Sequence, residues 1–174
     1  MEIKRVKDVM IPLDQYPHIN HSLPVRDAMA KLERAQFDVG ERKSLPRVML
    51  VFSDANELIG AASRRDIFRG LDPESLSEIM LPELLGKVKQ GEQAPSDKVI
   101  KKLVEKVQRP ISEVMTPVKD SVDYQDSIVN AIYKMADHNL SFLPVMKEKE
   151  VVGVVRTVEL LREVAMLCNI NKPR

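Results

Sequence analysis

Residues 6–12 read VKDVMIP, and residues 111–117 read ISEVMTP. The two stretches start 105 residues apart and agree in their apolar positions, their methionine and their closing proline. A match that returns at such a distance is the mark of an internal duplication. The residues that follow the two copies should then resemble each other as well.

An apolar stripe follows each copy at the spacing 0, 3, 4 and 7, which predicts one buried face of an amphipathic helix. Ser22 and Pro24 are start signals for the first helix, and Asp126 is one for the second. The stripe residues are Val25, Ala28, Met29 and Leu32 in the first copy, and Ile128, Ala131, Ile132 and Met135 in the second.

Two short apolar runs around a polar turn follow each helix and predict a pair of strands. A glycine occupies the same place in the second strand of each copy, Gly60 and Gly153. A closing helix is predicted from about Ser63 and from about Thr157. The predicted strands are Val48–Phe52 and Leu58–Ala62 in the first copy, and Phe142–Met146 and Val151–Val155 in the second.

The chain divides into a first repeat over 1–70, a connector over 71–110 and a second repeat over 111–174. The first repeat carries an insertion at about 38–47, and its charges, glycine and proline predict a loop without a new element. In the connector, helix-like stretches lie near Ser77–Leu85 and Asp97–Val107.

The predicted fold class is α+β, with two βαββα-type repeats and a helical connector between them. A repeat of this size buries little core by itself. We therefore expect the two repeats to pack face to face with pseudo-twofold symmetry and two equivalent clefts.

Composition excludes several classes of protein. A net charge of +1 and 4% aromatic residues argue against a nucleic-acid partner. No apolar run approaches the length of a membrane span, so no membrane is expected. The N-terminus has no signal-peptide core and Cys168 is the single cysteine, so we expect a cytoplasmic protein without a disulfide.

The ordered motifs resemble those of a tandem CBS-domain pair (a Bateman module), here as a stand-alone CBS domain-containing protein. The resemblance rests on VMIP at 9–12, VMTP at 114–117, LPV at 143–145, GAASRRD at 60–66 and GVVRTVE at 153–159. It implies a regulatory module with no catalysis and no required cofactor. It also implies an adenosine-containing ligand, of the AMP, ADP, ATP or S-adenosylmethionine type, in the cleft between repeats, and a flat homodimer.

The family's Gly-x-x-Thr/Ser-x-x-Asp motif is met by Ser63 and Asp66 in the first copy. The resemblance implies that the hydroxyl approaches phosphate and that the carboxylate accepts hydrogen bonds from the ribose hydroxyls. A carboxylate suits two neighbouring hydroxyls because it offers several lone pairs and no donor. The second copy departs from the motif, since Arg156 replaces the hydroxyl residue and Glu159 replaces the aspartate.

Further candidate ligand residues surround these motifs. Arginines beside the first motif could add positive charge for phosphate, and Arg156 could clamp a phosphate with two hydrogen bonds. Short apolar strands would form a slot for the base. The additional candidates are Arg64, Arg65, Ile19, Val122, Thr157, and Val51, which stands where the second copy has Pro144.

A simpler explanation exists for both motifs. Ser63 with an acid three residues later is close to a capping box, which only starts a helix. The duplication and the resemblance favour the ligand role for the first copy. In the second copy, Thr157 as a cap with Glu159 in the first turn explains the motif equally well.

The histidines, the basic residues of the insertion and the search for catalytic motifs add no further site to this prediction. His18 and His21 would point to opposite faces of an extended segment, so no metal site is predicted. Arg42, Lys43 and Arg47 in the insertion form either a cationic lid or a surface loop, and we favour the loop. No nucleophile–base pair or Gly-rich phosphate loop is present, so we expect no enzyme.

The sequence therefore predicts a regulatory sensor that binds an adenosine-containing ligand and passes the signal through a homodimer to an effector protein not encoded in this chain. The alternative is a ligand-free scaffold for dimerisation and interaction, which the altered second motif favours.

Overall fold

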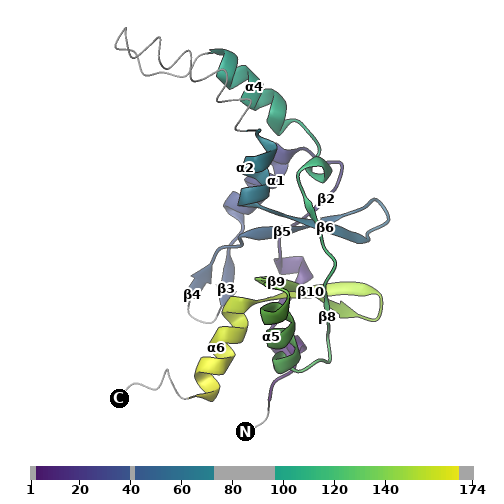
Figure 1. The fold of residues 1–174 in the computed structure, drawn as a ribbon, viewed down its shortest axis with the longest axis vertical. Coiled ribbons are helices and arrows are strands. Elements are labelled where there is room, and N and C mark those ends of the chain that lie inside the picture. Colours follow the sequence, from purple (N-terminus) through teal and green to yellow (C-terminus); the bar gives the residue numbers. More distant parts are fainter. Residues whose placement is uncertain (1–2, 40–41, 73–96, 169–174) are drawn as a thin grey trace. The chain divides into compact units, whose positions relative to one another are not determined.

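The computed structural model describes residues 3–39, 42–72 and 97–168. The chain forms two compact units: unit 1 consists of Met1–Tyr16 and Lys119–Arg174, and unit 2 of Pro17–Val118. Each unit contains a four-stranded sheet and α-helices, so the predicted α+β class is confirmed (Figure 1).

In unit 2 the sheet order is β2-β5-β6-β7, with β2 parallel to β5 and the other pairs antiparallel. The strands are β2 (His18–Asn20), β5 (Val48–Phe52), β6 (Leu58–Ser63) and β7 (Thr116–Pro117). The helices among the described residues of this unit are α1 (Val25–Arg34), α2 (Arg64–Gly70), α4 (Asp97–Val107) and a 3₁₀ turn at Ile111–Glu113.

In unit 1 the sheet order is β1-β10-β9-β8, with β8 parallel to β9. The strands are β1 (Ile11–Pro12), β8 (Val122–Asp123), β9 (Phe142–Lys147) and β10 (Glu150–Arg156). The helices are α5 (Ile128–Asp137), α6 (Thr157–Leu167) and 3₁₀ turns at Val6–Asp8 and Leu13–Gln15.

The predicted helix stripes form the centre of each hydrophobic core. Val25, Ala28 and Leu32 are buried in the core of unit 2, whereas the prediction that Met29 belongs to this buried face is wrong, since it is 39% exposed. Ile128, Ala131 and Met135 are buried in the core of unit 1, with Ile132 packed beside them. The cap of α5 is Ser127, whose hydroxyl accepts the N–H of Asn130, and not the predicted Asp126.

The prediction of a structureless loop at 38–47 is wrong. Two strands, β3 (Phe37–Val39) and β4 (Arg42–Ser44), pair as an antiparallel hairpin, which no other strand of the described residues joins. The alternation of apolar and polar residues in Phe-Asp-Val suits a strand and outweighed the charge and the glycine.

The connector prediction is confirmed in part. Its second helix-like stretch, Asp97–Val107, is α4. The stretch predicted near Ser77–Leu85 lies outside the described residues.

The two matching motifs each join the sheet that contains the strands of the opposite repeat. Residues 11–12, ahead of the first repeat's helix, pair with β10, and residues 116–117 pair with β6. The paired glycines make room for these segments. A β-carbon on Gly60 would lie 2.9 Å from the carbonyl oxygen of Thr116, and one on Gly153 would lie 2.5 Å from that of Ile11. These glycines are therefore required by close backbone approach.

We predict that Gly153→Ala destabilises the protein by about 1–3 kcal/mol in urea unfolding, because backbone must move to admit the methyl group. Met10→Ala should not rescue it: the sulfur of Met10 also lies 3.0 Å from the added atom, but the carbonyl of Ile11 is nearer. A double-mutant cycle with Met10→Ala measures this. Full recovery in the double variant would contradict the backbone explanation.

Candidate functional site

Ser63 and Asp66 meet at the start of α2. The hydroxyl of Ser63 accepts a hydrogen bond from the N–H of Asp66 at 3.1 Å. In return, Oδ2 of Asp66 accepts from the N–H of Ser63 at 2.8 Å and from its hydroxyl at 2.6 Å. The two residues thus form a capping box, and one carboxylate oxygen is committed to it.

The other oxygen of Asp66 faces two further donors. The hydroxyl of Thr116, on β7, donates to Oδ1 at 3.2 Å, and the guanidinium of Arg69 forms an ion pair with the same atom. Neither residue was among the sequence candidates. Two features of the sequence could have predicted them. Thr116 has a hydroxyl where the first copy has Ile11, and Arg69 lies three residues after Asp66, the spacing of neighbours on a helix.

Asp66 carries a negative charge at neutral pH. Burial raises the pKa of this carboxyl, but hydrogen bonds from the hydroxyl and N–H of Ser63, from Arg69 and from Thr116 together outweigh burial and hold it below its ordinary value. An ionised carboxylate is an acceptor only, which is the chemistry needed to bind hydroxyl groups.

The second motif is built differently. Arg156 and Glu159 are both buried and paired with each other. Oε2 of Glu159 accepts the N–H of Arg156 at 3.1 Å and its Nε at 2.9 Å, and the Nη2 of Arg156 reaches Oε1. The residue before α6 is Arg156 and Thr157 is already helical, so the prediction of Thr157 as the cap is wrong.

Tyr16 lies in the field of this pair. Burial raises the pKa of Tyr16; the positive charge of Arg156 lowers it and the negative charge of Glu159 raises it. Its phenol is therefore neutral across the physiological range. Ile11, which occupies the position of Thr116 on the corresponding strand, contributes no hydroxyl.

The apolar candidates lie in the sheets and cores of their units. Ile19 and Val51 are neighbours in the register of β2 and β5, and Val122 opposes Val145. Pro144 opposes Val154 in the pair formed by β9 and β10. All four candidates are buried, and their part in a base-binding slot remains a prediction.

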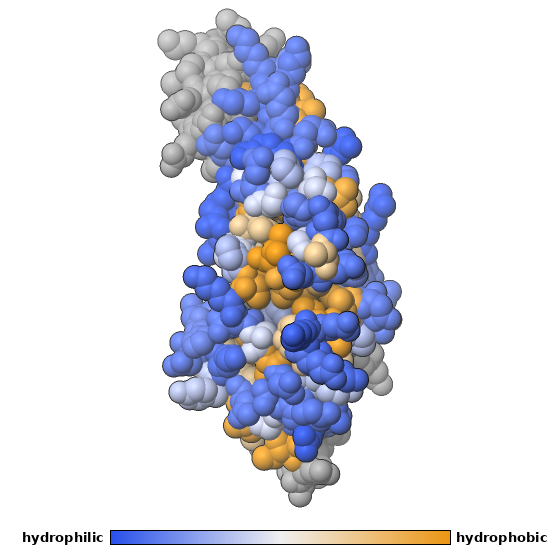
Figure 2. Space-filling view, turned by 90° about the vertical axis from the view of Figure 1, so that its right-hand side faces the viewer, coloured by the Kyte–Doolittle hydropathy of each residue, from blue (hydrophilic) through white to orange (hydrophobic). Residues whose placement is uncertain are grey.

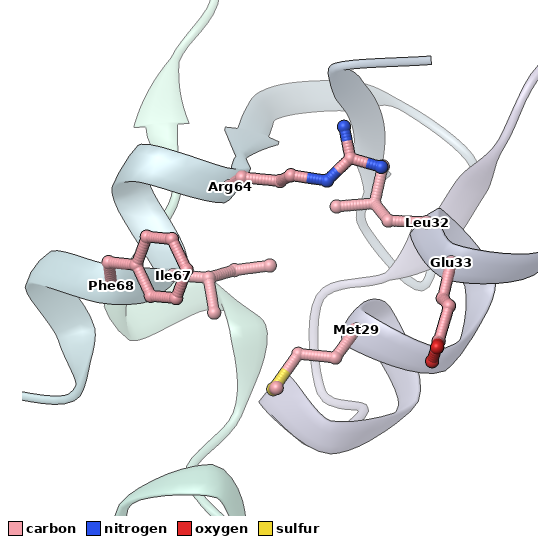
Figure 3. A pocket seen from close by; sticks show the side chains of 6 residues that line it. All are labelled: Met29, Leu32, Glu33, Arg64, Ile67 and Phe68. Atoms are coloured by element: carbon pink, nitrogen blue, oxygen red, sulfur yellow. The ribbon is translucent and has the colours of Figure 1, made fainter. Parts of the chain in front are cut away.

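The side chain of Arg64 is directed to the loop before β5 and shares no hydrogen bond with Asp66. Its Nη1 donates to the carbonyl oxygen of Pro46 at 3.2 Å, while Arg65 is exposed. Arg64 lines a pocket of about 240 Å³ between α1 and α2. Figure 3 shows its side chain on the opposite side of this pocket from Met29. The other lining residues are Met29, Leu32, Glu33, Ile67 and Phe68.

The two histidines near β2, His18 and His21, contact other side chains and do not belong to a cluster of metal ligands among the described residues. His21 lies 3.4 Å from Asp54, and the ring of His18 meets that of Phe52 edge-on. Over residues 3–39, 42–72 and 97–168, no group of three His, Cys, Asp or Glu side chains is arranged to hold a metal ion.

Within the same ranges, no helix is both long and apolar enough to cross a bilayer.

The CBS-domain family model matches the chain twice, over residues 6–72 and 111–166, which together are more than half of its length. No curated protein matches the sequence.

Solved structures share the fold. CBSX2 in complex with AMP is 19% identical, with a TM-score of 0.62, and 94% of this chain and 98% of that one are covered. A CBS domain-containing protein of unknown function from Kribbella flavida is 15% identical, with a TM-score of 0.68 and coverage of 93% and 98%. The cytosolic domain of the Mg²⁺ channel MgtE in complex with ATP is 19% identical, with a TM-score of 0.58 and coverage of 91% and 48%.

The lowered pKa of Asp66 predicts a pH dependence of stability. Its contribution is fully present above the ordinary aspartate value of about 3.9 and is lost as the pH falls through the lower folded value. Asp66→Asn removes this contribution. Urea unfolding should therefore show that the variant loses less stability than the wild type between pH 5 and pH 3; equal losses would contradict the assignment.

Proposed function

The chain belongs to the CBS-domain family, and from that premise we propose that it is a regulatory module that binds an adenosine-containing ligand at Ser63 and Asp66. The observation that carries the proposal is the ionised carboxylate of Asp66, held between two hydroxyl side chains, those of Ser63 and Thr116. The ligand class is AMP, ADP, ATP or S-adenosylmethionine. Fold relatives in complex with AMP and with ATP support this class.

The chemistry of Asp66 suits a ribose. Its carboxylate is ionised and its side chain is 12% exposed, so a hydrogen bond to it is charge-assisted and partly shielded from water. A ribose hydroxyl is a donor, and an ionised carboxylate accepts such a hydrogen bond without offering a competing donor. Exposed Arg65, one residue before Asp66, adds positive charge for an attached phosphate.

We assign the working site to the first motif alone. At both motifs the carboxylate oxygens already accept hydrogen bonds, but both oxygens of Glu159 are held by buried Arg156, whereas the side chain of Arg69, a partner of Asp66, is 67% exposed. Releasing Glu159 for a ligand would leave a buried arginine without its counter-ion, which costs several kcal/mol. For the same reason Arg156 is a poor phosphate clamp.

A homodimer is the second part of the proposal. Phe68 on α2 and Leu161 on α6 occupy equivalent positions of the two repeats and are 64% and 68% exposed. Tyr133 on α5 is 71% exposed. Figure 2 shows one face of the molecule, where hydrophobic residues form separate patches on a mainly hydrophilic surface. A second copy would cover such side chains, and the dimer would act in the cytoplasm on a separate effector protein.

A ligand-free scaffold is the competing function. The closed Arg156–Glu159 pair favours it, because that motif is satisfied internally. The exposed apolar side chains are compatible with both functions.

A thermal-shift panel with AMP, ADP, ATP and S-adenosylmethionine separates the two. A ligand at 100 times its Kd stabilises the protein by about 2.7 kcal/mol, or roughly 5–10 °C for a chain of this size. Asp66→Asn should abolish the shift, whereas the matched Glu159→Gln should retain most of it. No shift with any compound would favour the scaffold, and equal losses in the two variants would contradict a single site in the first motif.

For the dimer, we predict that Phe68→Glu lowers the mass measured by light scattering from that of a dimer to that of a monomer, because a buried charge is costly in an apolar interface. Gln36→Glu, an exposed position given the same charge, should remain dimeric. A wild-type chain that is monomeric at micromolar concentration would refute the proposal.

A further inference from the structure

The carboxylate of Asp66 is fully engaged within its own unit. Oδ2 accepts two hydrogen bonds from Ser63, and Oδ1 accepts one from Thr116 and one from Arg69. A carboxylate offers about four acceptor positions, so these donors fill them. A ligand hydroxyl can reach Asp66 only if one donor leaves.

The donors differ in how easily they can leave. The two from Ser63 start α2, and Thr116 is held on β7, which is paired with β6. The side chain of Arg69, by contrast, is 67% exposed. An exposed ion pair contributes little to stability, and a long side chain regains freedom when it is released. Arg69 is therefore the donor that a ligand displaces.

We propose that Arg69 is a displaceable counter-ion of Asp66 that makes the site prefer phosphorylated nucleosides over neutral ones. A neutral nucleoside takes the place of Arg69 and leaves the guanidinium without a partner. A nucleotide brings a phosphate on the same ribose, to which the released guanidinium can bind with two hydrogen bonds. This inference rests on the proposed ribose site at Asp66.

Neighbouring residues support the choice of Arg69. Arg64, on the same helix, is directed to the carbonyl oxygen of Pro46 and lines the pocket between α1 and α2. At the second motif, the counter-ion of Glu159 is buried Arg156, whose removal is far more costly. An exposed, exchangeable counter-ion is therefore a property of the first motif.

The test is calorimetric titration of the full chain with adenosine and with AMP. In Arg69→Met we expect adenosine to bind about two- to fivefold more tightly, because no ion pair is broken. AMP should lose a similar factor, so the preference for AMP falls by about tenfold. Arg69→Lys, which keeps the charge, should retain most of the preference.

Arg34→Met is the matched control, since it removes an exposed arginine at the last turn of α1 that has no contact with Asp66. It should leave both affinities unchanged. If the wild type binds AMP and Arg69→Met keeps the same preference, the role of Arg69 is overturned while the ribose site stands. If neither protein binds either compound, the role of Arg69 is refuted, and the thermal-shift panel with ADP, ATP and S-adenosylmethionine decides whether the ribose site stands. Adenosine binding by Arg69→Met alone would support the counter-ion role.

Discussion

The backbone of β7 lies so close to β6 that a β-carbon on Gly60 would be 2.9 Å from the carbonyl oxygen of Thr116. The same close approach occurs between β1 and Gly153 in unit 1. Each contact completes a four-stranded sheet with a segment from far away in the chain. In unit 2 it also brings the hydroxyl of Thr116 to Asp66, fifty residues earlier, so the geometry of the candidate site depends on it.

Each unit pairs a repeated motif with the strands of the other repeat, but the acidic residue of the motif has different partners in the two units. In unit 2 an aspartate contacts a serine, a threonine and an exposed arginine. In unit 1 the longer glutamate folds back on buried Arg156, and Ile11 supplies no donor. Desolvation explains the difference, since an exposed counter-ion returns to water at little cost while a buried one does not.

The sequence predicted helices and strands well where one face of the element is buried, because apolar residues then recur at a regular spacing. The strands Val48–Phe52 and Leu58–Ala62 and the stripe at Val25, Ala28 and Leu32 could be read in advance because one face of each element is apolar. The hairpin at β3 and β4 was missed because its charged residues, glycine and proline were interpreted as a loop, and strand pairing cannot be seen in the linear sequence. Thr157 was misassigned as a cap because sequence spacing does not fix the residue at which a helix begins.

By itself the sequence determined that this protein is a duplication of one α+β repeat and that Ser63 and Asp66 keep a motif which Arg156 and Glu159 alter. These properties reside in residue types and short spacings, which remain visible in the linear chain. Only the tertiary structure decided that each repeated motif joins the opposite repeat's strands, that Thr116 and Arg69 share one oxygen of Asp66, and that Arg156 and Glu159 close on each other. Such contacts depend on side-chain direction and on pairings between distant segments, and no periodicity along the chain encodes either.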